Sequence, residues 1–514
     1  MIGGDLTIYD GALYAPSGRI NLASTASKGK VIPTHSDLLM EGFEKQGNIN
    51  ITSSQNFSYF DEDGDPLANV DVIGYGGEIF IRGGKFVLDN ARMYADTYGY
   101  ESGRIDIAID GDMHVTNSSE IAADNYGDGQ GTFVDITANE LRLEGVNVYE
   151  IQQMLSEIDI DFYIKNHLKY RNFSDINEEE AANLEKEIRA KIIFLVDSVE
   201  EILSETDANE NISFDTVLDK INLNEENQDV TDIFADISID IKNRFGNTIT
   251  IGNISAGPEA TGGNIKINTS FLKIDTGIIQ VVTEGPGKAG NIEIEAEQIE
   301  LPALGFINAT TGFNFEYPTV EKEDGGGFGQ GGNITINATD EIYVNSFGNI
   351  TVGADVGTSG KAGNIYLNTQ HLTLDNGQIN SSSSGTGNAG EIKITANTIL
   401  LDYESSIYTE ADLAGGGNIS IQALDGIELF NYSLISAEAF GTEPQDKGGN
   451  LTINAPNIFT SKSEGLDSRI AKSEGLDSRI AKSEGLDSIT VKSEGLDSRI
   501  LLWYKSIFSH ELLI

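Results

Sequence analysis

A short motif, Gly-Gly-Asn-Ile-x-Ile, recurs along this chain of 514 residues at intervals of about 27 to 32 residues. A fixed period of this size is typical of supersecondary units that stack on one another, each contacting only its neighbours. The repeat therefore constrains the fold more than any other feature of the chain. Clear copies begin at Gly262, Ala289, Gly331, Ala362, Ala389, Gly416 and Gly448, and looser copies begin at Gly3, Gly18, Gly47, Gly76 and Gly103.

Each repeat contains three short stretches in which apolar and polar residues alternate, as they do in half-buried β-strands. Turn residues separate the stretches, for example at 275–277 and 285–287. Three strands in about 27 residues predict one rung of a parallel β-helix, and the chain has room for roughly twelve or thirteen such rungs. In the unit that starts at Gly263, the alternating apolar residues are Ile265, Ile267, Leu272, Ile274, Ile279 and Val281.

The third strand of each rung predicts a column of inward residues in which a large residue is followed by a small one two positions later. The large residues are Ile350, Ile379, Ile407 and Ile435, and the small ones are Val352, Ser381, Thr409 and Ala437. Earlier rungs carry Leu13 and Ala15, Met93 and Ala95, and Ile121 and Ala123. The asparagine after each glycine pair is expected in a turn, where it tolerates a left-handed φ and bonds its own backbone.

The repeat stops between Gly145 and Gly246, where the chain contains neither glycine nor proline. Asn177 with Glu180 three residues later is a helix-start pattern. A stripe of apolar residues at helical spacing follows it. The pattern predicts an acidic α-helical insertion at 149–246, between β-helix rungs at 1–148 and 247–460. The stripe consists of Leu184, Ile188, Ile192, Leu195, Val199 and Ile202.

The C-terminal segment, 461–514, has a different repeat. A ten-residue unit starting Lys-Ser-Glu-Gly-Leu-Asp-Ser returns almost unchanged from Lys462, Lys472, Lys482 and Lys492. It has too few apolar positions to bury a core, so we expect it to be poorly ordered. The final apolar residues, 501–514, are either out-of-frame readthrough or a strip that covers the last rung. They are too short to span a membrane, and we expect no transmembrane span.

The composition of the chain limits its possible partners and the kinds of site it can form. The chain has 81 acidic and 33 basic residues, a formal charge of −48, and no cysteine. This balance excludes nucleic acid and anionic membranes as partners, because both require a basic footprint. Without cysteine there is no disulfide framework and no thiolate metal site. An acidic coat that keeps a long rod in solution accounts for the charge without any partner.

Parallel β-helices also include enzymes that cleave acidic polysaccharides, so we searched for paired carboxylates on one sheet face. Asp106, Asp110 and Asp135 could lie on neighbouring rungs, but so many acids produce such neighbours by chance. The five histidines, His35, His114, His167, His371 and His510, do not accompany an evident nucleophile. We therefore expect no catalytic residues and no enzymatic activity.

One loop has the composition of a metal site. Asp61, Asp63 and Asp65 alternate around Gly64, which suits a hard cation such as Ca²⁺. Pro66 stands where the turn glycine of an EF-hand loop would lie, and the bidentate glutamate is missing. A plain solvated loop is the alternative interpretation. No other cofactor motif is present; the glycine pairs precede strands, whereas phosphate-binding glycines precede helices.

Several segments resemble filamentous-haemagglutinin-like exoproteins, especially the cyanobacterial ones. They are Gly3-Gly4-Asp5-Leu6-Thr7-Ile8-Tyr9-Asp10-Gly11-Ala12-Leu13-Tyr14-Ala15-Pro16-Ser17-Gly18-Arg19-Ile20-Asn21-Leu22, then Gly332-Asn333-Ile334-Thr335-Ile336-Asn337-Ala338, and Leu372-Thr373-Leu374-Asp375-Asn376-Gly377-Gln378-Ile379. The resemblance covers about 1–148 and 247–460. It implies a right-handed parallel β-helix, export by two-partner secretion through an outer-membrane transporter, and adhesion at the surface of a Gram-negative bacterium.

In that family a signal peptide and a secretion domain precede the segment that starts here at Gly3. Met1-Ile2-Gly3-Gly4 is not a signal peptide, since it has no basic region and no apolar run. The expected function is that of a secreted or cell-surface structural or adhesive exoprotein segment that contacts glycans or proteins of hosts, neighbouring cells or the matrix. The alternatives are a carbohydrate-active lyase or hydrolase and a non-exported fragment with no function of its own.

Overall fold

The computed structural model describes most of the β-helical repeats and a few parts of the remaining chain. The described residues are 1–54, 59–60, 66–129, 131–145, 164, 186, 188–194, 196, 198–199, 247–253, 261–283, 287–311, 329–354, 358–440, 448–460, 469–472 and 489–491.

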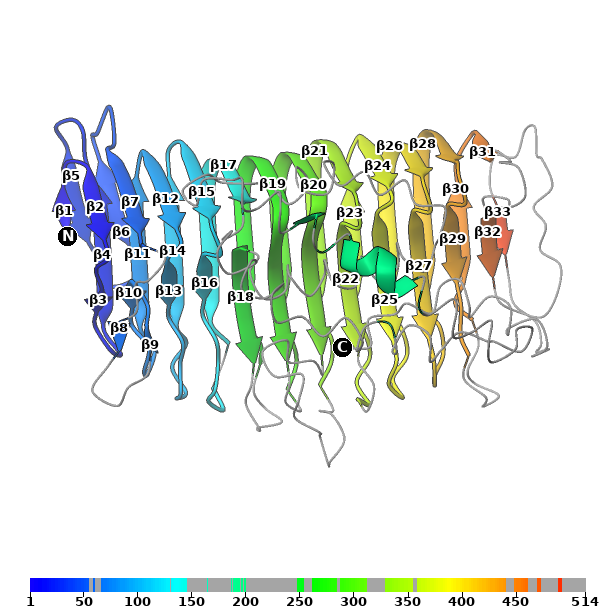
Figure 1. Ribbon diagram of the computed structural model, residues 1–514, viewed down its shortest axis with the longest axis horizontal. Coiled ribbons are helices and arrows are strands. Elements are labelled where there is room, and N and C mark those ends of the chain that lie inside the picture. Colours follow the sequence, from blue (N-terminus) through cyan, green and yellow to red (C-terminus); the bar gives the residue numbers. More distant parts are fainter. Residues whose placement is uncertain are drawn as a thin grey trace.

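The described repeats form a rod built from one parallel β-helix (Figure 1). Each rung contributes a strand to three stacks, which we call sheets 1, 2 and 3 in chain order. In sheet 3 the parallel pairing runs without interruption from Leu13 through Val70 and Met93 to Ile470. The described residues thus contain twelve rungs, and the predicted fold class is confirmed.

Sheet 1 contains β1 (Ile2–Gly3), β4 (Arg19–Ser24), β11 (Glu78–Gly83), β14 (Arg104–Ile109), β23 (Ile365–Asn368), β30 (Leu451–Asn454) and the first parts of β17 (Phe133–Glu144), β19 (Asn264–Thr283), β20 (Ile292–Thr311), β21 (Ile334–Asn345), β26 (Ile392–Asp402) and β28 (Ile419–Leu429). Sheet 2 contains β2 (Leu6–Tyr9), β7 (Asn48–Thr52), β12 (Lys85–Asp89), β15 (Asp112–Thr116), β24 (His371–Asp375), β31 (Ile458–Thr460) and the continuations of those six long strands. Sheet 3 contains β3 (Leu13–Tyr14), β10 (Val70–Asp71), β13 (Arg92–Tyr94), β16 (Glu120–Ala122), β18 (Asn247–Asn253), β22 (Asn349–Ala354), β25 (Gln378–Ser383), β27 (Ser406–Ala411), β29 (Leu434–Ala437), β32 (Arg469–Lys472) and the ends of β19 and β20.

The core is a set of aliphatic columns along the rod axis, one layer per rung. The alternating pattern of each strand places its apolar residues inward, where stacking removes them from water. All seven isoleucines predicted to point inward are fully buried: Ile265, Ile267, Ile279, Ile350, Ile379, Ile407 and Ile435. The large-then-small column also has the predicted register, because Ile379 pairs with Ile407 and Ser381 pairs with Thr409.

A column of glycines marks the start of sheet 1. A Cβ atom on Gly363 would collide with the carbonyl oxygen of Gly332 one rung earlier. The same collision relates Gly390 to Gly363 and Gly417 to Gly390. Only glycine allows the backbones of successive rungs to approach this closely. The glycines of the motif therefore follow from a steric requirement of the stack.

The asparagines that follow these glycines form a ladder, and the prediction of a left-handed turn was wrong. Asn333 Nδ2 donates to Asn291 Oδ1 at 3.0 Å, and Asn364 Nδ2 donates to Asn333 Oδ1 at 3.1 Å. The same oxygens accept the backbone N–H groups of the next rung. None of the ladder asparagines has a positive φ. The side chain thus bonds the backbone N–H of the neighbouring rung, while the carbonyl oxygens of Asn291 and Asn333 accept from the Ile265 and Ile292 N–H groups.

Rung length varies more than the sequence period indicates. Asn264 and Asn291 are 27 residues apart, whereas Asn291 and Asn333 are 42 residues apart. Most of the difference falls at the corner from sheet 3 to sheet 1, since the paired residues Thr283 and Thr311 lie 8 and 22 residues before Asn291 and Asn333. The register also shifts by one residue between Lys273 and Asp275 and between Ala296 and Gln298. Two antiparallel hairpins also extend from corners: β5 (Lys30–Pro33) with β6 (Leu38–Glu41), and β8 (Tyr59–Phe60) with β9 (Pro66–Leu67).

Within the predicted insertion, the described residues of 186–199 are helical. Ile188, Ile192 and Val199, three members of the predicted stripe, are buried. Val196 is buried as well, while the predicted Leu184, Leu195 and Ile202 lie outside the described residues. No helix in the described part of the chain is both long enough and apolar enough to cross a membrane.

The C-terminal repeats add two strands to the end of the rod. β32 pairs in parallel with β29, so that Ile470 continues the column of Ile435. β33 (Ile489–Val491) pairs antiparallel with β30. These strands cover part of the last sheet edges, although this segment was predicted to be poorly ordered. The rest of 461–514 lies outside the described residues.

Candidate functional site

The predicted metal ligands Asp61, Asp63 and Asp65 lie outside the described residues, so the Ca²⁺ site stays a prediction. Among the residues that the structure does describe, no group of three or more His, Asp or Glu side chains is arranged to hold a metal ion.

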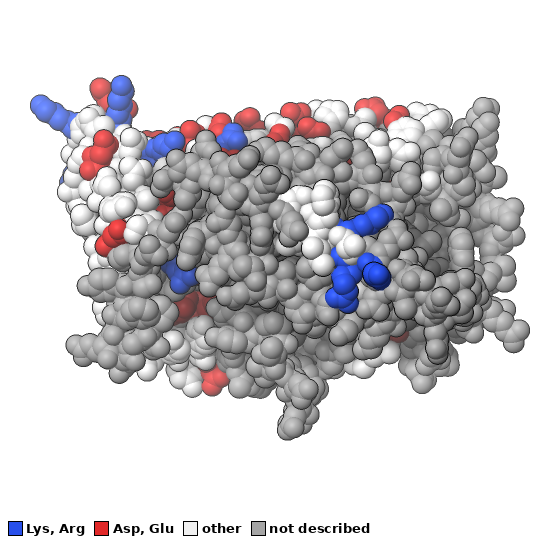
Figure 2. Space-filling view, in the orientation of Figure 1, with Lys and Arg blue, Asp and Glu red and all other residues white. Residues whose placement is uncertain are grey.

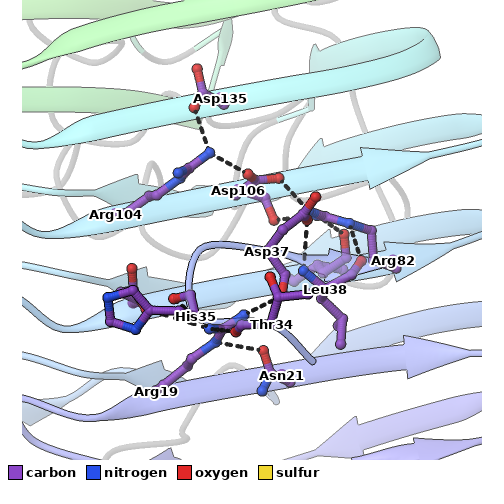
Figure 3. Close-up of polar contacts among 12 residues, drawn as sticks. Arg19, Asn21, Thr34, His35, Asp37, Leu38, Arg82, Arg104, Asp106 and Asp135 are labelled. Carbon is purple, nitrogen blue, oxygen red and sulfur yellow. Dashed lines mark hydrogen bonds and ion pairs between the residues drawn. The ribbon is translucent and has the colours of Figure 1, made fainter. Parts of the chain in front are cut away.

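Two of the three carboxylates singled out in the sequence come together. Asp106 on β14 pairs with Asp135 on β17 in neighbouring rungs of sheet 1. Both contact Arg104, whose Nη2 lies 2.6 Å from Asp106 Oδ2 and 3.3 Å from Asp135 Oδ2 (Figure 3). Asp110 lies past the end of β14, where its Oδ2 accepts a 2.7 Å hydrogen bond from Gln46.

A second arginine links this pair to the β5–β6 hairpin. Arg82 on β11 donates through Nη2 to Asp37 Oδ1 at 2.7 Å and lies 2.8 Å from Asp106 Oδ1 (Figure 3). Its Nε donates to the carbonyl oxygen of Leu38 at 3.0 Å. Its Nη1 donates to the carbonyl oxygens of Ile81 and Asp106, each at 2.9 Å. The guanidinium therefore has a partner for each of its nitrogens.

Arg19 on β4 holds the tip of the same hairpin. Its Nη1 donates to the carbonyl oxygens of Thr34 at 2.6 Å and His35 at 3.0 Å (Figure 3). Its Nη2 donates to the carbonyl oxygen of Asp37 at 2.7 Å. Three carbonyls of one turn thus converge on a single guanidinium, which fixes the conformation of the turn.

The three arginines surround Phe80, an apolar residue on the outer face of sheet 1. The guanidinium carbons of Arg19, Arg82 and Arg104 lie 4.0, 5.6 and 5.5 Å from the centre of its ring. Phe80 is fully buried and packs with Ala23 and Leu38. A phenylalanine on the outer face of a sheet would be exposed to water. The β5–β6 hairpin packs over Phe80 and buries it, and the cation–π contacts with the arginines add to this stabilisation.

The electrostatics of this arginine cluster favour a structural role. Burial would raise the pKa of Asp37, but hydrogen bonds from Arg82 and the Leu38 N–H, together with the charges of Arg82 and Arg104, lower it below its ordinary value. Burial raises the pKa of Asp135, although Arg104 opposes the shift. The carboxylates of Asp106 and Asp135 share the guanidinium of Arg104, and Asp106 also pairs with Arg82. The cluster anchors the hairpin.

The described histidines do not form a catalytic pair with a carboxylate. His371 Nδ1 lies 2.8 Å from Thr398 Oγ1 on the next rung. His114 lies on the outer face of sheet 2, where burial lowers its pKa. The carbonyl oxygen of His35 accepts from Arg19. His167 and His510 lie outside the described residues.

A column of polar, mostly uncharged side chains runs along the outer face of sheet 1 over seven consecutive rungs. Its members are exposed or half-buried, and we call it the sheet 1 polar column. It consists of Asn268, Glu295, Asn337, Asn368, Thr395, Gln422 and Asn454. An open hollow of about 450 Å³ lies beside it, lined by Ser270, Phe271, Glu297, Gln298, Thr339, Asp340 and Gln370.

Sequence reasoning missed a second surface feature, at the corner between sheets 3 and 1. Tyr75, Tyr98 and Tyr126 occupy equivalent positions on three successive rungs, and each is exposed. The signal was present in the sequence, since each tyrosine precedes a glycine in the turn. In the view of Figure 2, acidic side chains line the upper edge of the rod, and the basic ones gather near the N-terminal end and on one short segment.

No known protein family, curated protein or solved structure matches this chain.

Proposed function

We propose that this chain is a segment of a secreted or cell-surface exoprotein that works as a structural and adhesive rod, without catalysis. The observation that carries the proposal is the sheet 1 polar column, which places a polar side chain on each of seven rungs, five of them carboxamides. The resemblance of the repeats to filamentous-haemagglutinin-like exoproteins supports the same class.

The chemistry of the column suits neutral glycans. Each carboxamide of Asn337, Asn368 and Gln422 offers a donor and an acceptor, which is the pairing that sugar hydroxyl groups require. Rungs in such a stack are about 4.8 Å apart, so the groups form an evenly spaced row. A formal charge of −48 disfavours acidic ligands. A neutral polymer lying along the rod would meet a polar group on each of these seven rungs and a carboxamide on five of them.

Binding of this kind depends on how many weak contacts form at the same time. A single exposed hydrogen bond contributes about 0.5–1.5 kcal/mol, which is too little to hold a ligand. Several rungs that bind one polymer, or several rods that bind one cell surface, raise the apparent affinity by avidity. Divalent ions such as Ca²⁺ could bridge the acidic rod to anionic surfaces.

The route and location follow from the resemblance. We propose export by two-partner secretion, with an outer-membrane transporter as the partner during export and the outer surface of a Gram-negative bacterium, or the medium, as the destination. A transporter gene beside the gene for this chain, and a secretion domain encoded with it, would support this part of the proposal.

The test is binding of the purified chain to a panel of neutral and acidic glycans and to cells, with and without millimolar Ca²⁺. The triple variant N337A/N368A/Q422A removes three amides of the column. We expect at least a tenfold loss of glycan binding by avidity. The matched control is T7A/N50A/T373A, which removes neutral polar groups from the outer face of sheet 2 and should bind as the parent does.

Two results would overturn the proposal. Equal binding by the triple variant and the control would show that the column is not the adhesive surface. New reducing ends or unsaturated products, after incubation with acidic polysaccharides, would favour the alternative of a carbohydrate-active enzyme.

A further inference from the structure

The tyrosine corner carries a second surface of different chemistry. We use this name for Tyr75, Tyr98, Tyr100 and Tyr126, whose side chains are 64%, 53%, 80% and 38% exposed. Isolated parallel bridges link Gly74 to Thr97 and Thr97 to Asn125, so the tyrosines that follow these residues stand above one another. Large exposed aromatic groups gathered in one place mark a binding surface more often than single ones do.

The backbone of the corner holds the rings in place. The Tyr98 N–H donates to the Gly74 carbonyl oxygen, and the Tyr126 N–H donates to that of Thr97, both at 2.8 Å. The Tyr75 N–H donates to Ser17 Oγ at 2.8 Å. The backbone that carries Tyr75, Tyr98 and Tyr126 is therefore held on successive rungs, so less conformational entropy is lost when a ligand binds.

The rings lie against the rod and against each other. The rings of Tyr98 and Tyr126 are stacked, with centroids 5.1 Å apart and planes inclined by 25°. A Cβ atom on Gly99 would meet the ring of Tyr75 at 2.6 Å, so this glycine leaves room for the ring on the preceding rung. The glycine after Tyr98 thus has a steric role.

The charge of the corner is uniformly negative. Its segments 72–77, 95–103 and 123–132 contain Asp96, Glu101, Asp124 and Asp128, and no lysine, arginine or histidine. Glu101 packs against Gly76, beside Tyr75, where its Oε2 would lie 3.1 Å from a Cβ on that glycine. Glu101 and Asp128 are exposed. The faces of aromatic rings also carry partial negative charge, so the rings and the carboxylates both attract cations.

We infer that the tyrosine corner binds a basic segment of a partner polypeptide. Its lysine or arginine side chains lie over the exposed faces of Tyr75, Tyr98 and Tyr100, and their charges meet Glu101 and Asp128. Charge complementarity selects this occupant, because the corner unites ring faces with carboxylates and offers an anionic ligand only repulsion. This surface is separate from the sheet 1 polar column, and its ligand is a cation where that of the column is neutral.

The test uses an arginine–glycine heptapeptide as the probe and measures its affinity for the full-length chain at low and at physiological salt. An acidic rod attracts any cationic peptide, so the variants are matched in charge. E101Q/D128N removes two carboxylates at the corner, whereas E428Q/D425N removes two exposed ones from β28, far from the corner in the sequence. Y75A/Y98A/Y100A removes ring faces without any change in charge, and Y75F/Y98F/Y100F keeps them.

We expect about a tenfold loss of affinity for the alanine variant and none for the phenylalanine variant, since the ring face provides the contact. E101Q/D128N should lose more affinity than E428Q/D425N. Equal losses of affinity for the two charge variants, or unchanged binding by the alanine variant, would overturn the inference. Either result would mean that the peptide is attracted by the overall negative charge of the rod and not by the tyrosine corner. Binding of a neutral oligosaccharide at this corner, lost in the alanine variant, would also overturn it.

Discussion

The side chain of Asn247 joins the two ends of the chain segment that interrupts the β-helix. Its Nδ2 donates to the carbonyl oxygen of Gly145 at 2.7 Å, and these residues are 102 positions apart in the sequence. Its Oδ1 accepts from the Ser119 N–H at 3.1 Å on the preceding rung. Asn247 is fully buried, so both bonds form away from water. The β-helix therefore resumes directly beside the point where it stops.

Replacement of Asn247 by alanine should open this junction. The change leaves the Gly145 carbonyl and the Ser119 N–H without their partner, and each buried unpaired group costs about 1–3 kcal/mol. Hydrogen exchange at the Ser119 amide should become at least tenfold faster. Thr248→Ala, one residue further and half-buried, is the control and should exchange as the parent does. Unchanged protection in Asn247→Ala would mean that the junction is held by other contacts.

The same closeness predicts that the insertion can be removed. A short Gly/Ser bridge in place of 150–245 should join the two parts of the rod with little strain, because Gly145 and Asn247 already lie within hydrogen-bond reach. Circular dichroism should then show the β signal retained and the helical contribution lost. Aggregation or loss of the β signal would indicate that the rod depends on the insertion.

The glycine column gives a matched pair of substitutions. Gly363→Ala would drive a Cβ into the carbonyl oxygen of Gly332, so two rungs must separate, at a cost of roughly 3 kcal/mol or more. Gly353→Ala adds the same methyl group where the nearest atom, on Thr310, is 3.4 Å away, an ordinary contact. Its effect on the free energy of unfolding should stay within about 1 kcal/mol. Similar melting curves for the two variants would contradict the steric account.

The inward residues of the rod could be predicted from the sequence because alternation with period two leaves a strand one apolar face. Ile407 and Ile435 are examples, and both are fully buried. The arginine cluster could not be predicted in this way, because the position of the β5–β6 hairpin depends on contacts far apart in sequence. One clue was present: Phe80 is an apolar residue between Ile79 and Ile81, at a position that alternation assigns to the outside.

The asparagine ladder shows a different limit. Asparagine beside glycine is a common turn pattern, and the local sequence does not reveal whether the side chain bonds its own backbone or the next rung. Only the stacking places Asn364 Nδ2 beside Asn333 Oδ1. The tyrosine corner could be predicted in part. The recurrence of Tyr-Gly at 75, 98 and 126 is visible in the sequence, but only the register of the rungs shows that these tyrosines lie above one another.

The ladder is interrupted at Glu391, and completing it should stabilise the rod. Glu391→Asn keeps the backbone N–H that already donates to Asn364 Oδ1 at 2.8 Å and adds a side-chain donor. We expect a gain of about 0.5–1.5 kcal/mol in the free energy of unfolding. The pKa of Tyr366, raised by burial and by the charge of Glu391, should fall towards its ordinary value. A difference titration against Tyr366→Phe measures this shift, and a lower melting temperature would contradict the first expectation.

Asp96 makes the stability of the rod depend on pH. Burial raises its pKa well above the ordinary value of 3.8, and the charge of Asp124 on the next rung adds to the shift, although the Asp124 N–H opposes it. Because the folded state holds the proton more tightly than the unfolded chain, stability from this residue is present below pH 3.8 and is lost as pH rises through the folded pKa.

Asp96→Asn removes the charge and keeps an acceptor for the Asp124 N–H. The variant should therefore be more stable than the parent at pH 7, on the order of 1 kcal/mol or more, with the advantage disappearing near pH 4. Denaturant unfolding at both pH values checks this, and Asp425→Asn, the same change at an exposed position, is the control. If Asp96→Asn raises the free energy of unfolding equally at the two pH values, the stabilisation does not come from the titration of Asp96.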